Sequence, residues 1–520
     1  MKNRLSKILL LFSSMVLSGC SFEGFSFSLT SLSSSESMST NPRDTLNKTK
    51  LNYTYDDYSL RSGTDSCPNV GNPKLLIIPI WFNDSSTFIS NKENVRNDIE
   101  TTYFGTNEET GWRSVKTYYE ELSKNTASLT GTVSEWHTLD CSYQDYEPST
   151  DTTTALVGTA TDWYFNTHTN ESRKDYDSNG DGYLDGIILI YAAPNYKYFN
   201  NYQSNLWAYS YWTYENVADV NNPTTNIFFW ASYDFMYGNN AATRTEKLDW
   251  GYGDTTNCNL DAHTFIHEMG HVFGLDDYYD YSGQYIPAGA FSMQDYNVGS
   301  HDPYSVMALG WANPYIPTET CEITINAFQD SNDVILLTPS WNTDNSPFDE
   351  YLLLELYTPT GLNQFDITYP YGKGLTKGSK IPGIRLWHVD ARLLYYPTEE
   401  STSSIDYVTN NPYEGLGVYH MMSNTYYKEG INEAYISQLG KDYANYNLLQ
   451  LIRNQTHETY DSISRLSSSS LFLEGDSFSM NTFSGQFYNS GKLNTNIDLG
   501  WSFEVKSIQN EQATIKLIKG

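Results

Sequence analysis

A stretch of five residues, His267-Glu-Met-Gly-His271, has the residue types and the spacing that could bind a zinc ion. Side chains four positions apart lie on one face of an α-helix, so His267 and His271 can direct ring nitrogens to one point. Glu268 is rotated by about 100° from His267 and can act as a general base toward a metal-bound water. The five residues alone do not distinguish a metal site from an ordinary turn of helix.

The residues that follow extend the pattern to HExxHxxGxxD. A hydrolytic zinc site has three protein ligands and one open position, and a turn at Gly274 would bring Asp277 back toward the two histidines. Asp276 is the competing third ligand, and the spacing favours Asp277. Met293, 22 residues after His271, is the candidate for the methionine turn that lies beneath the metal in metzincin-type sites. A methionine of the core is the alternative.

The segment 261–275, which carries the motif, has the apolar spacing of a helix. Asp261 is the N-cap candidate, and Gly274 can end the helix because glycine tolerates the left-handed conformation. Gly270 lets another element approach closely. His263 lies on the same face as His267 and is expected to support the site or belong to the core. The apolar contacts of the helix would come from Phe265, Met269, Val272 and Phe273.

The rest of the chain divides into two parts with different sequence patterns. Apolar runs of strand length at 73–83 and 182–193 predict buried strands, and 113–133 changes from helical spacing to strand-like alternation. Up to about residue 315 we therefore expect mixed helices and strands. Beyond Pro314, short strand-like runs such as CEITINAF, DVILLTP, EYLLLELY, GIRLWHVD, WSFEVKSI and ATIKLI are separated by turn residues, which predicts a β-rich domain of sandwich type.

A second candidate metal site is the acidic segment DYDSNGDGYLDG, residues 175–186. Its oxygen-bearing residues recur at every second position, as in a calcium loop, with Gly182 at the sharp turn. Position 12 is Ile188 rather than Glu, so the segment is not an EF-hand. The alternative is an Asx-rich turn that leads into a strand. The candidate calcium ligands are Asp177, Asn179, Asp181, Tyr183 and Asp185.

The N-terminus, MKNRLSKILLLFSSMVLSGC, has the basic start, apolar run and small residues of an export signal over 1–20. Its ending resembles a bacterial lipobox, which predicts a lipid on Cys20 and a location at the extracellular face of the cell membrane. A plain signal peptide cut nearby is the alternative. Residues 21–50 are predicted to be a Ser/Thr-rich tether, and 51–72 a lead-in segment.

Charge restricts the partners of the protein. The chain has 62 Asp and Glu against 31 Lys and Arg, a net charge of −31, whereas binding to nucleic acid or anionic lipid requires clustered cations. We therefore expect no nucleic-acid partner, no membrane contact beyond the lipid anchor, and a monomer.

Four further cysteines would permit two disulfides in an exported protein, with three pairings open.

The segment HEMGHVFGLDDYYD, residues 267–280, resembles the active-site segment of the immune inhibitor A family of secreted metallopeptidases. Other matching segments follow in the expected order between about residues 70 and 395, among them PKLLIIPIWFND, DSNGDGYLDGIILIYA, SMQDYN and GIRLWHVD. The resemblance implies peptide-bond hydrolysis with His267, His271 and Asp277 as zinc ligands and Glu268 as base. It also implies a β-rich module behind the catalytic domain. Many relatives carry a long propeptide, which the short stretch after Cys20 cannot provide.

The predicted fold class is α+β, with a zincin-type mixed α/β catalytic domain over 73–315 followed by a β-rich, sandwich-like domain over 316–520. The predicted function is a surface-anchored zinc endopeptidase that hydrolyses extracellular proteins or peptides, with Zn²⁺ and also Ca²⁺ as its metals. The alternative is a surface adhesin or glycan-binding lipoprotein on the same scaffold. Glu268 separates the two hypotheses, because only hydrolysis requires a base.

Overall fold

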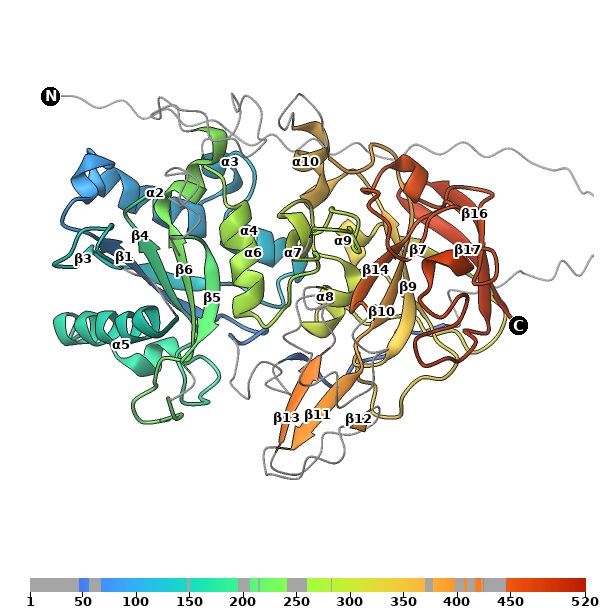
Figure 1. Ribbon diagram of the computed structural model, residues 1–520, viewed down its shortest axis with the longest axis horizontal. Helices are drawn as coiled ribbons and strands as arrows, with labels where there is room; N and C mark the ends of the chain where they lie inside the picture. The colour runs from blue at the N-terminus through green and yellow to red at the C-terminus, as the bar shows by residue number, and fades with distance from the viewer. Residues whose placement is uncertain are drawn as a thin grey trace, which may run out of the picture. The chain divides into compact units, whose positions relative to one another are not determined.

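The described residues of the computed structural model lie within the stretch Asn41–Gly520 (Figure 1). The predicted signal peptide with Cys20, and also Cys258, lie outside the described residues. No helix within the described part is long and apolar enough to cross a membrane. The described residues are 46–55, 67–146, 150–194, 206–213, 216–240, 260–281, 283–369, 377–397, 406–408, 417–421, 424 and 446–520.

The first part of this stretch contains a six-stranded sheet. Its strands are β1 (Lys74–Trp81), β2 (Thr130–Val133), β3 (His137–Thr138), β4 (Ile187–Tyr191), β5 (Tyr209–Trp212) and β6 (Ile227–Ser232). They are ordered β2–β1–β4–β6–β5, with β3 beside the far end of β1. The pairings are parallel except that of β5 with β6, which is antiparallel. The strands predicted within 73–83 and 182–193 are confirmed.

Helices cover both faces of this sheet, which explains why its central strands are continuously apolar. The helices are α2 (Lys92–Phe104), α3 (Asn107–Thr110), α4 (Val115–Leu122), α5 (Thr150–Thr167) and α6 (His263–Val272). Leu75 and Ile77 of β1 join a core with α2, α4 and α6, whereas Leu76 and Ile78 join a second core with α5. Figure 1 shows α5 on the opposite side of the sheet from α6.

Helix α6 begins one residue later than the sequence suggests. Its N-cap is Ala262, so the prediction of Asp261 as the cap is wrong. The Asp261 carboxylate accepts from the backbone N–H of His263 at 2.9 Å, but the same oxygen also binds Nδ1 of that histidine at 2.7 Å. Asp261 is therefore engaged with the ring as well as with the helix start. Gly274, with φ of 102°, follows the end of the helix as predicted.

Beyond Pro314 the structure is rich in antiparallel strands, and all six quoted runs are confirmed as strands. The strands are β7 (Cys321–Asn326), β8 (Ile335–Leu337), β9 (Glu350–Tyr357), β10 (Gly383–Asp390), β11 (Leu393–Pro397), β12 (Asp406–Val408), β13 (Gly417–Met421), β14 (Leu449–Ile452), β15 (Ser477–Ser479), β16 (Trp501–Gln509) and β17 (Gln512–Lys519). They form the sheets β14–β10–β9–β8, β12–β11–β13 and β15–β16–β17–β7. Short helices α7 (Met293–Tyr296), α8 (Pro303–Ala308), α9 (Phe328–Ser331) and α10 (Gln364–Thr368) lie between the two parts in sequence or within the second.

The β14–β10–β9–β8 sheet is packed on both of its faces. On one face Leu354 and Leu386 share a core with Val505 and Ile515 of the β15–β16–β17–β7 sheet, as expected for two sheets that pack face to face. On the other face Trp387 belongs to the core that contains α6. This sheet therefore joins the strand-rich part to the part that carries the metal motif.

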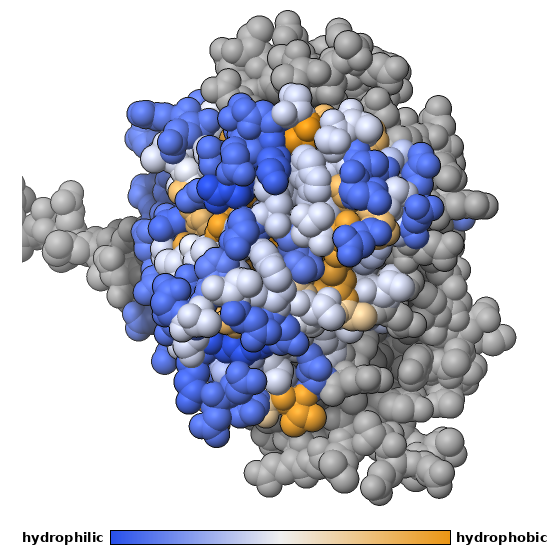
Figure 2. All heavy atoms as spheres, turned by 90° about the vertical axis from the view of Figure 1, so that its left-hand side faces the viewer, coloured by the Kyte–Doolittle hydropathy of each residue, from blue (hydrophilic) through white to orange (hydrophobic). Residues whose placement is uncertain are grey.

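The described structure is thus mixed α/β with several sheets and few helices, consistent with the predicted α+β class. Figure 2 shows the side on which α2, β3 and α5 lie: hydrophilic residues predominate there and hydrophobic ones form small groups. Cys141 and Cys321 form no disulfide in the structure.

Candidate metal centre

The three predicted zinc ligands meet at one point. Nε2 of His267 and Nε2 of His271 lie 3.0 and 3.2 Å from Oδ1 of Asp277, and the two nitrogens are 3.1 Å apart. All three side chains are buried. Among the described residues no other group of three His, Cys, Asp or Glu side chains brings its ligand atoms within 4.8 Å of one another. Asp276, the competing candidate, is not part of the group.

Hydrogen bonds on the far side of each ring determine which nitrogen faces this point. Nδ1 of His267 lies 2.7 Å from the carbonyl oxygen of Met293, and Nδ1 of His271 lies 2.8 Å from that of Leu275. A carbonyl only accepts, so each Nδ1 carries the proton in the neutral ring and each Nε2 presents a lone pair. Oδ1 of Asp277 has no hydrogen-bond donor. With both rings neutral, three acceptor atoms therefore converge, which is the arrangement of ligand atoms that could hold a metal ion.

The spacing of these atoms fits zinc. The three atoms form a triangle with sides of 3.0 to 3.2 Å. The corners of such a triangle lie about 1.8 Å from its centre, close to the usual zinc–nitrogen and zinc–oxygen distances of about 2.0–2.2 Å. Two imidazoles and one carboxylate are also a donor set found in catalytic zinc sites. The geometry thus agrees with the ligands predicted from the sequence.

Charge at the site favours an ionised aspartate. Burial opposes ionisation of Asp277, but the two histidines hold the pKa of its carboxyl well below the usual range. Burial likewise lowers the pKa of His267, but Asp277 outweighs this effect and raises it to about 9. A metal ion would replace the proton that holds these groups together in its absence. The Asp277 carboxylate is therefore anionic at neutral pH.

Glu268 is buried beside the ligands, on the same helix. Burial raises the pKa of its carboxyl, and the neighbouring rings of His271 and His267 oppose this rise in part. The hydroxyl of Ser210 on β5 donates to Oε2 of Glu268 at 3.3 Å and to its carbonyl oxygen at 3.2 Å. A carboxylate with a raised pKa is a stronger base. The contact with Ser210 places β5 beside this candidate base.

Met293 is buried, as a methionine-turn residue or a core residue would be. Its defined contribution to the site is its backbone carbonyl, which accepts from His267. Several other supporting groups were not anticipated from the sequence: Ser210, Gln294 and Tyr281. They are far from the motif or have common residue types, so no spacing rule identifies them in advance.

Gly270 allows Gln294 to pack directly against α6. A Cβ added at Gly270 would lie 2.2 Å from Oε1 and 2.6 Å from Cδ of Gln294, whose Oε1 is 3.1 Å from Nε2 of His301. We expect Gly270→Ala to lower the free energy of unfolding by about 1–3 kcal/mol, although alanine favours a helix by about 1 kcal/mol. Gly158→Ala in α5 is the matched control, because nothing lies within 4 Å of its added Cβ. Denaturant unfolding measures both, and stabilisation by both would contradict this packing.

Tyr281 holds the second oxygen of the aspartate ligand. Its hydroxyl donates to Oδ2 of Asp277 at 2.8 Å, which leaves Oδ1 directed at the histidines. Groups that orient metal ligands contribute about 10–100-fold to metal affinity, so we expect Tyr281→Phe to weaken zinc binding by about tenfold. Competition with a chromophoric chelator measures this change. Tyr296→Phe removes a hydroxyl from a neighbouring, partly exposed ring and serves as the control; equal affinities for the two variants would refute the assignment.

His263 supports the helix and is not a ligand. Its ring stacks on Trp112 with centroids 4.0 Å apart. Asp261 and Asp366 flank its two nitrogens at 2.7 and 3.4 Å. Burial lowers the pKa of His263, but the two carboxylates outweigh it and raise the pKa to about 9. The expectation that this residue supports the site or belongs to the core agrees with these contacts.

The candidate calcium loop has the hydrogen bonds of an Asx-rich turn. Asp177 accepts from three backbone N–H groups of its own loop at 2.8 to 3.1 Å. Asp185 accepts from the backbone N–H groups of Lys74 and Ser178. Asn179 donates to Asp181, whose other oxygen accepts from the N–H of Tyr183. The loop is therefore ordered by its own hydrogen bonds, and calcium binding there stays a prediction.

Models of known protein families and curated proteins were both compared with the chain, and neither comparison finds a match. The resemblance to immune inhibitor A peptidases therefore depends on the motif residues alone.

Proposed function

We propose that the protein is a zinc-dependent endopeptidase of the immune inhibitor A type, with a zincin-type catalytic domain over residues 73–315. The observation that carries this proposal is the convergence of Nε2 of His267, Nε2 of His271 and Oδ1 of Asp277 within 3.2 Å, with a buried carboxylate beside them. A structural zinc site normally has four protein ligands, whereas three leave a position open for catalysis. A structural site also has no use for Glu268.

His267, His271 and Asp277 would hold the zinc ion. When bound, zinc lowers the pKa of a water molecule and polarises a carbonyl oxygen. Glu268 takes a proton from the attacking water and delivers it to the leaving nitrogen of the scissile peptide. Its raised pKa suits both steps, because the carboxyl is basic enough to accept the proton and acidic enough to return it.

The position of β5 supports a peptide substrate. In the described sheet β5 is the outermost strand beyond β6, and Ser210 on it contacts Glu268. An extended peptide can pair with the open edge of a strand through main-chain hydrogen bonds, which largely ignore sequence. A substrate paired with β5 would therefore present a peptide bond close to the base. This geometry favours an endopeptidase over a hydrolase of small amides.

The N-terminal residues support the proposal that the enzyme is exported and attached to the extracellular face of the bacterial membrane through a lipid on Cys20. Its substrates would then be extracellular proteins or peptides. The acidic surface would disfavour strongly anionic partners such as nucleic acids.

Cleavage of an unfolded protein by the purified protein tests the proposal. We expect proteolysis with zinc supplied, loss of cleavage after treatment with a chelator, and recovery when zinc is restored. The binding-protein alternative predicts no cleavage in any of these states. A folded, zinc-loaded protein that cleaves no unfolded substrate would exclude a general endopeptidase.

A further inference from the structure

The strand-rich part of the chain holds the two loops that complete the metal centre. The ligand loop, residues 275–281, contains Asp277, and the turn segment, residues 283–293, ends at Met293. Both loops lie against residues that follow or belong to β10 and β14 of the second part. Buried side chains donate to backbone carbonyls of these loops, and backbone hydrogen bonds cross the same junction.

Arg453, directly after β14, makes the most extensive of these contacts. Its guanidinium is buried, with 1 % of the residue exposed. Nη2 donates to the carbonyl oxygens of Ile286 and Ser464 at 2.6 and 2.7 Å, and Nη1 donates to that of Leu451 at 3.0 Å. One side chain therefore joins the turn segment to two stretches of the second part. A guanidinium suits this task because its donors are fixed in one plane.

Backbone hydrogen bonds reinforce the same junction. The N–H of Ile286 donates to Ser462 at 2.9 Å, that of Leu451 to Pro287 at 2.9 Å, and that of Leu466 to Gly289 at 2.7 Å. The turn segment is thus paired over residues 286–289 with residues between 451 and 466. Because buried hydrogen bonds are costly to leave unmade, the segment cannot shift without disrupting these pairs.

Two more side chains secure the loops from the same sheet. Nη1 of Arg385, on β10, donates to the carbonyl oxygen of Phe291 at 3.3 Å, while its Nε is 2.7 Å from Glu355 on β9. Nδ2 of Asn424 donates at 2.8 Å both to the carbonyl of Tyr278 in the ligand loop and to that of Leu449. Both loops are therefore tied to the β14–β10–β9–β8 sheet.

Two hydrogen bonds connect the turn segment to His267 of the candidate metal centre. Asp295 accepts from the N–H of Ala290 at 2.6 Å, which closes the turn around Met293. The carbonyl of Met293 then accepts from Nδ1 of His267. A displacement of the turn segment would therefore rotate or release a metal ligand. Outer contacts of this kind set ligand orientation, and with it metal affinity.

We propose that the β14–β10–β9–β8 sheet is a structural part of the metal centre, and that Arg453 is a positioning residue that sets zinc affinity through the turn segment. This inference depends on the zinc site of the proposed function. It assigns the strand-rich part a role in holding the catalytic site, separate from any role in substrate recognition. Zinc binding and the packing of the sheet against the loops are then energetically coupled, and the coupling acts in both directions.

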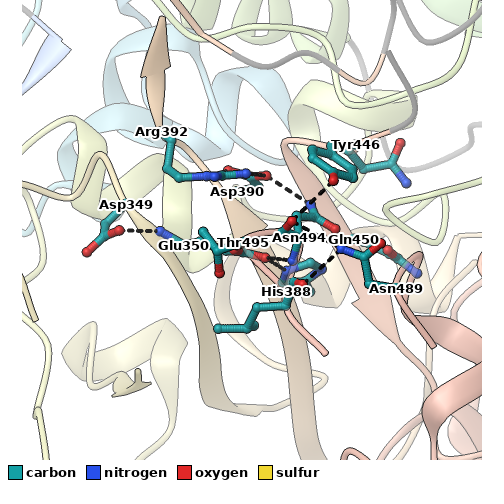
Figure 3. Close-up of polar contacts among 12 residues, drawn as sticks. Asp349, Glu350, His388, Asp390, Arg392, Tyr446, Gln450, Asn489, Asn494 and Thr495 are labelled. Carbon is teal, nitrogen blue, oxygen red and sulfur yellow. Dashed lines mark hydrogen bonds and ion pairs between the residues drawn. The ribbon is translucent and has the colours of Figure 1, made fainter. Parts of the chain in front are cut away.

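Arg453→Met tests the proposal, with Arg392→Met as the matched control. Figure 3 shows Arg392 in a buried polar cluster of the same sheet, where it donates to both oxygens of Asp390 at 2.7 Å. In the same cluster His388 lies 2.9 Å from Glu350. Both variants remove a buried guanidinium and both should lower the midpoint of thermal unfolding. Arg453 donates to the turn segment at Ile286, whereas Arg392 donates to Asp390 at the end of β10.

We expect Arg453→Met in the full chain to weaken zinc binding by about 10–100-fold, and Arg392→Met to change it by less than about threefold. Chelator competition gives the affinities. The visible absorption of the cobalt-substituted protein, which reports ligand geometry, should change in Arg453→Met alone. Arg453→Lys, which retains a donor, should restore part of the affinity. Equal zinc affinities and cobalt spectra for the two Met variants would overturn the proposal.

Hydrogen exchange of the wild-type protein tests the coupling without any substitution. We expect zinc to slow exchange at the amides of Ile286, Leu451 and Leu466, in addition to those of α6 and the ligand loop. Protection confined to α6 and the ligand loop would overturn the proposal. A wild-type protein that binds no zinc would refute both this inference and the proposed function. Zinc binding with the expected coupling but without proteolysis would refute the peptidase alone.

Discussion

Glu268→Gln is expected to lower kcat/KM for peptide cleavage by about 10³-fold, within the range of about 10²–10⁴ that general acid–base catalysis contributes. Glutamine has nearly the same shape as glutamate and can still accept from Ser210, which lies 3.3 Å from the carboxylate. It cannot take a proton from water at neutral pH. Because Glu268 is not one of the three converging ligands, zinc affinity should stay within about threefold of wild type.

The measurement combines initial rates on a fluorogenic peptide with zinc affinity by chelator competition. Ser210→Ala is the graded control: it removes the hydroxyl donor to Glu268 but leaves the base, so we expect a loss smaller than that of Glu268→Gln. Glu268→Gln with full activity and bound zinc would exclude Glu268 as the base. A loss of zinc binding in the same variant would mean that Glu268 holds the metal.

The second large effect is expected at the third ligand. Zinc at about 1,000 times its dissociation constant should stabilise the wild-type protein by about 4 kcal/mol, because it binds only the folded chain. Asp277→Ala should abolish most of this stabilisation, since Oδ1 of Asp277 is the sole carboxylate oxygen in the converging group. The expected result is a rise in the thermal midpoint on zinc addition for wild type and little or no rise for the variant.

Asp276→Ala is the matched control, because it removes the neighbouring carboxylate that the sequence offers as an alternative ligand. We expect it to retain the zinc-dependent rise in the thermal midpoint. The opposite pattern, with the rise lost in Asp276→Ala and kept in Asp277→Ala, would contradict the arrangement of the ligand loop. Scanning calorimetry with and without zinc gives both results.

The contacts of Arg453, Arg385 and Asn424 bear on how the two parts of the chain depend on each other. The predicted boundary near residue 315 separates a part with mixed helical and strand patterns from a part with strand patterns. The hydrogen bonds to Ile286, Phe291 and Tyr278 cross this boundary and end next to the metal centre. If the sheet positions the site, the region before 315 expressed alone should bind zinc more weakly than the full chain.

Local patterns in the sequence were enough to predict several strands and helices and the candidate metal ligands. Periodicity and length were sufficient for β1, for α4 followed by β2, and for β4, because a strand or helix buried on one or both faces must be apolar at a regular spacing. The spacing of His267, His271 and Asp277 was sufficient for the metal group, because the helix pitch and the turn at Gly274 act over only 11 residues. The N-cap at Ala262 differed because the carboxylate of Asp261 also binds the ring of His263.

The residues that surround these candidate ligands could not be predicted from local patterns. Ser210 reaches Glu268 across 58 residues, and Arg453 reaches Ile286 across 167. Such contacts depend on which strands become neighbours and on how two sheets pack, and no local pattern encodes them. Hydrogen bonding likewise showed that the residues of the candidate calcium loop have backbone partners that their spacing does not reveal. Short-range chemistry can be read from spacing because the helix and the turn are nearly rigid, whereas long-range support depends on the whole fold.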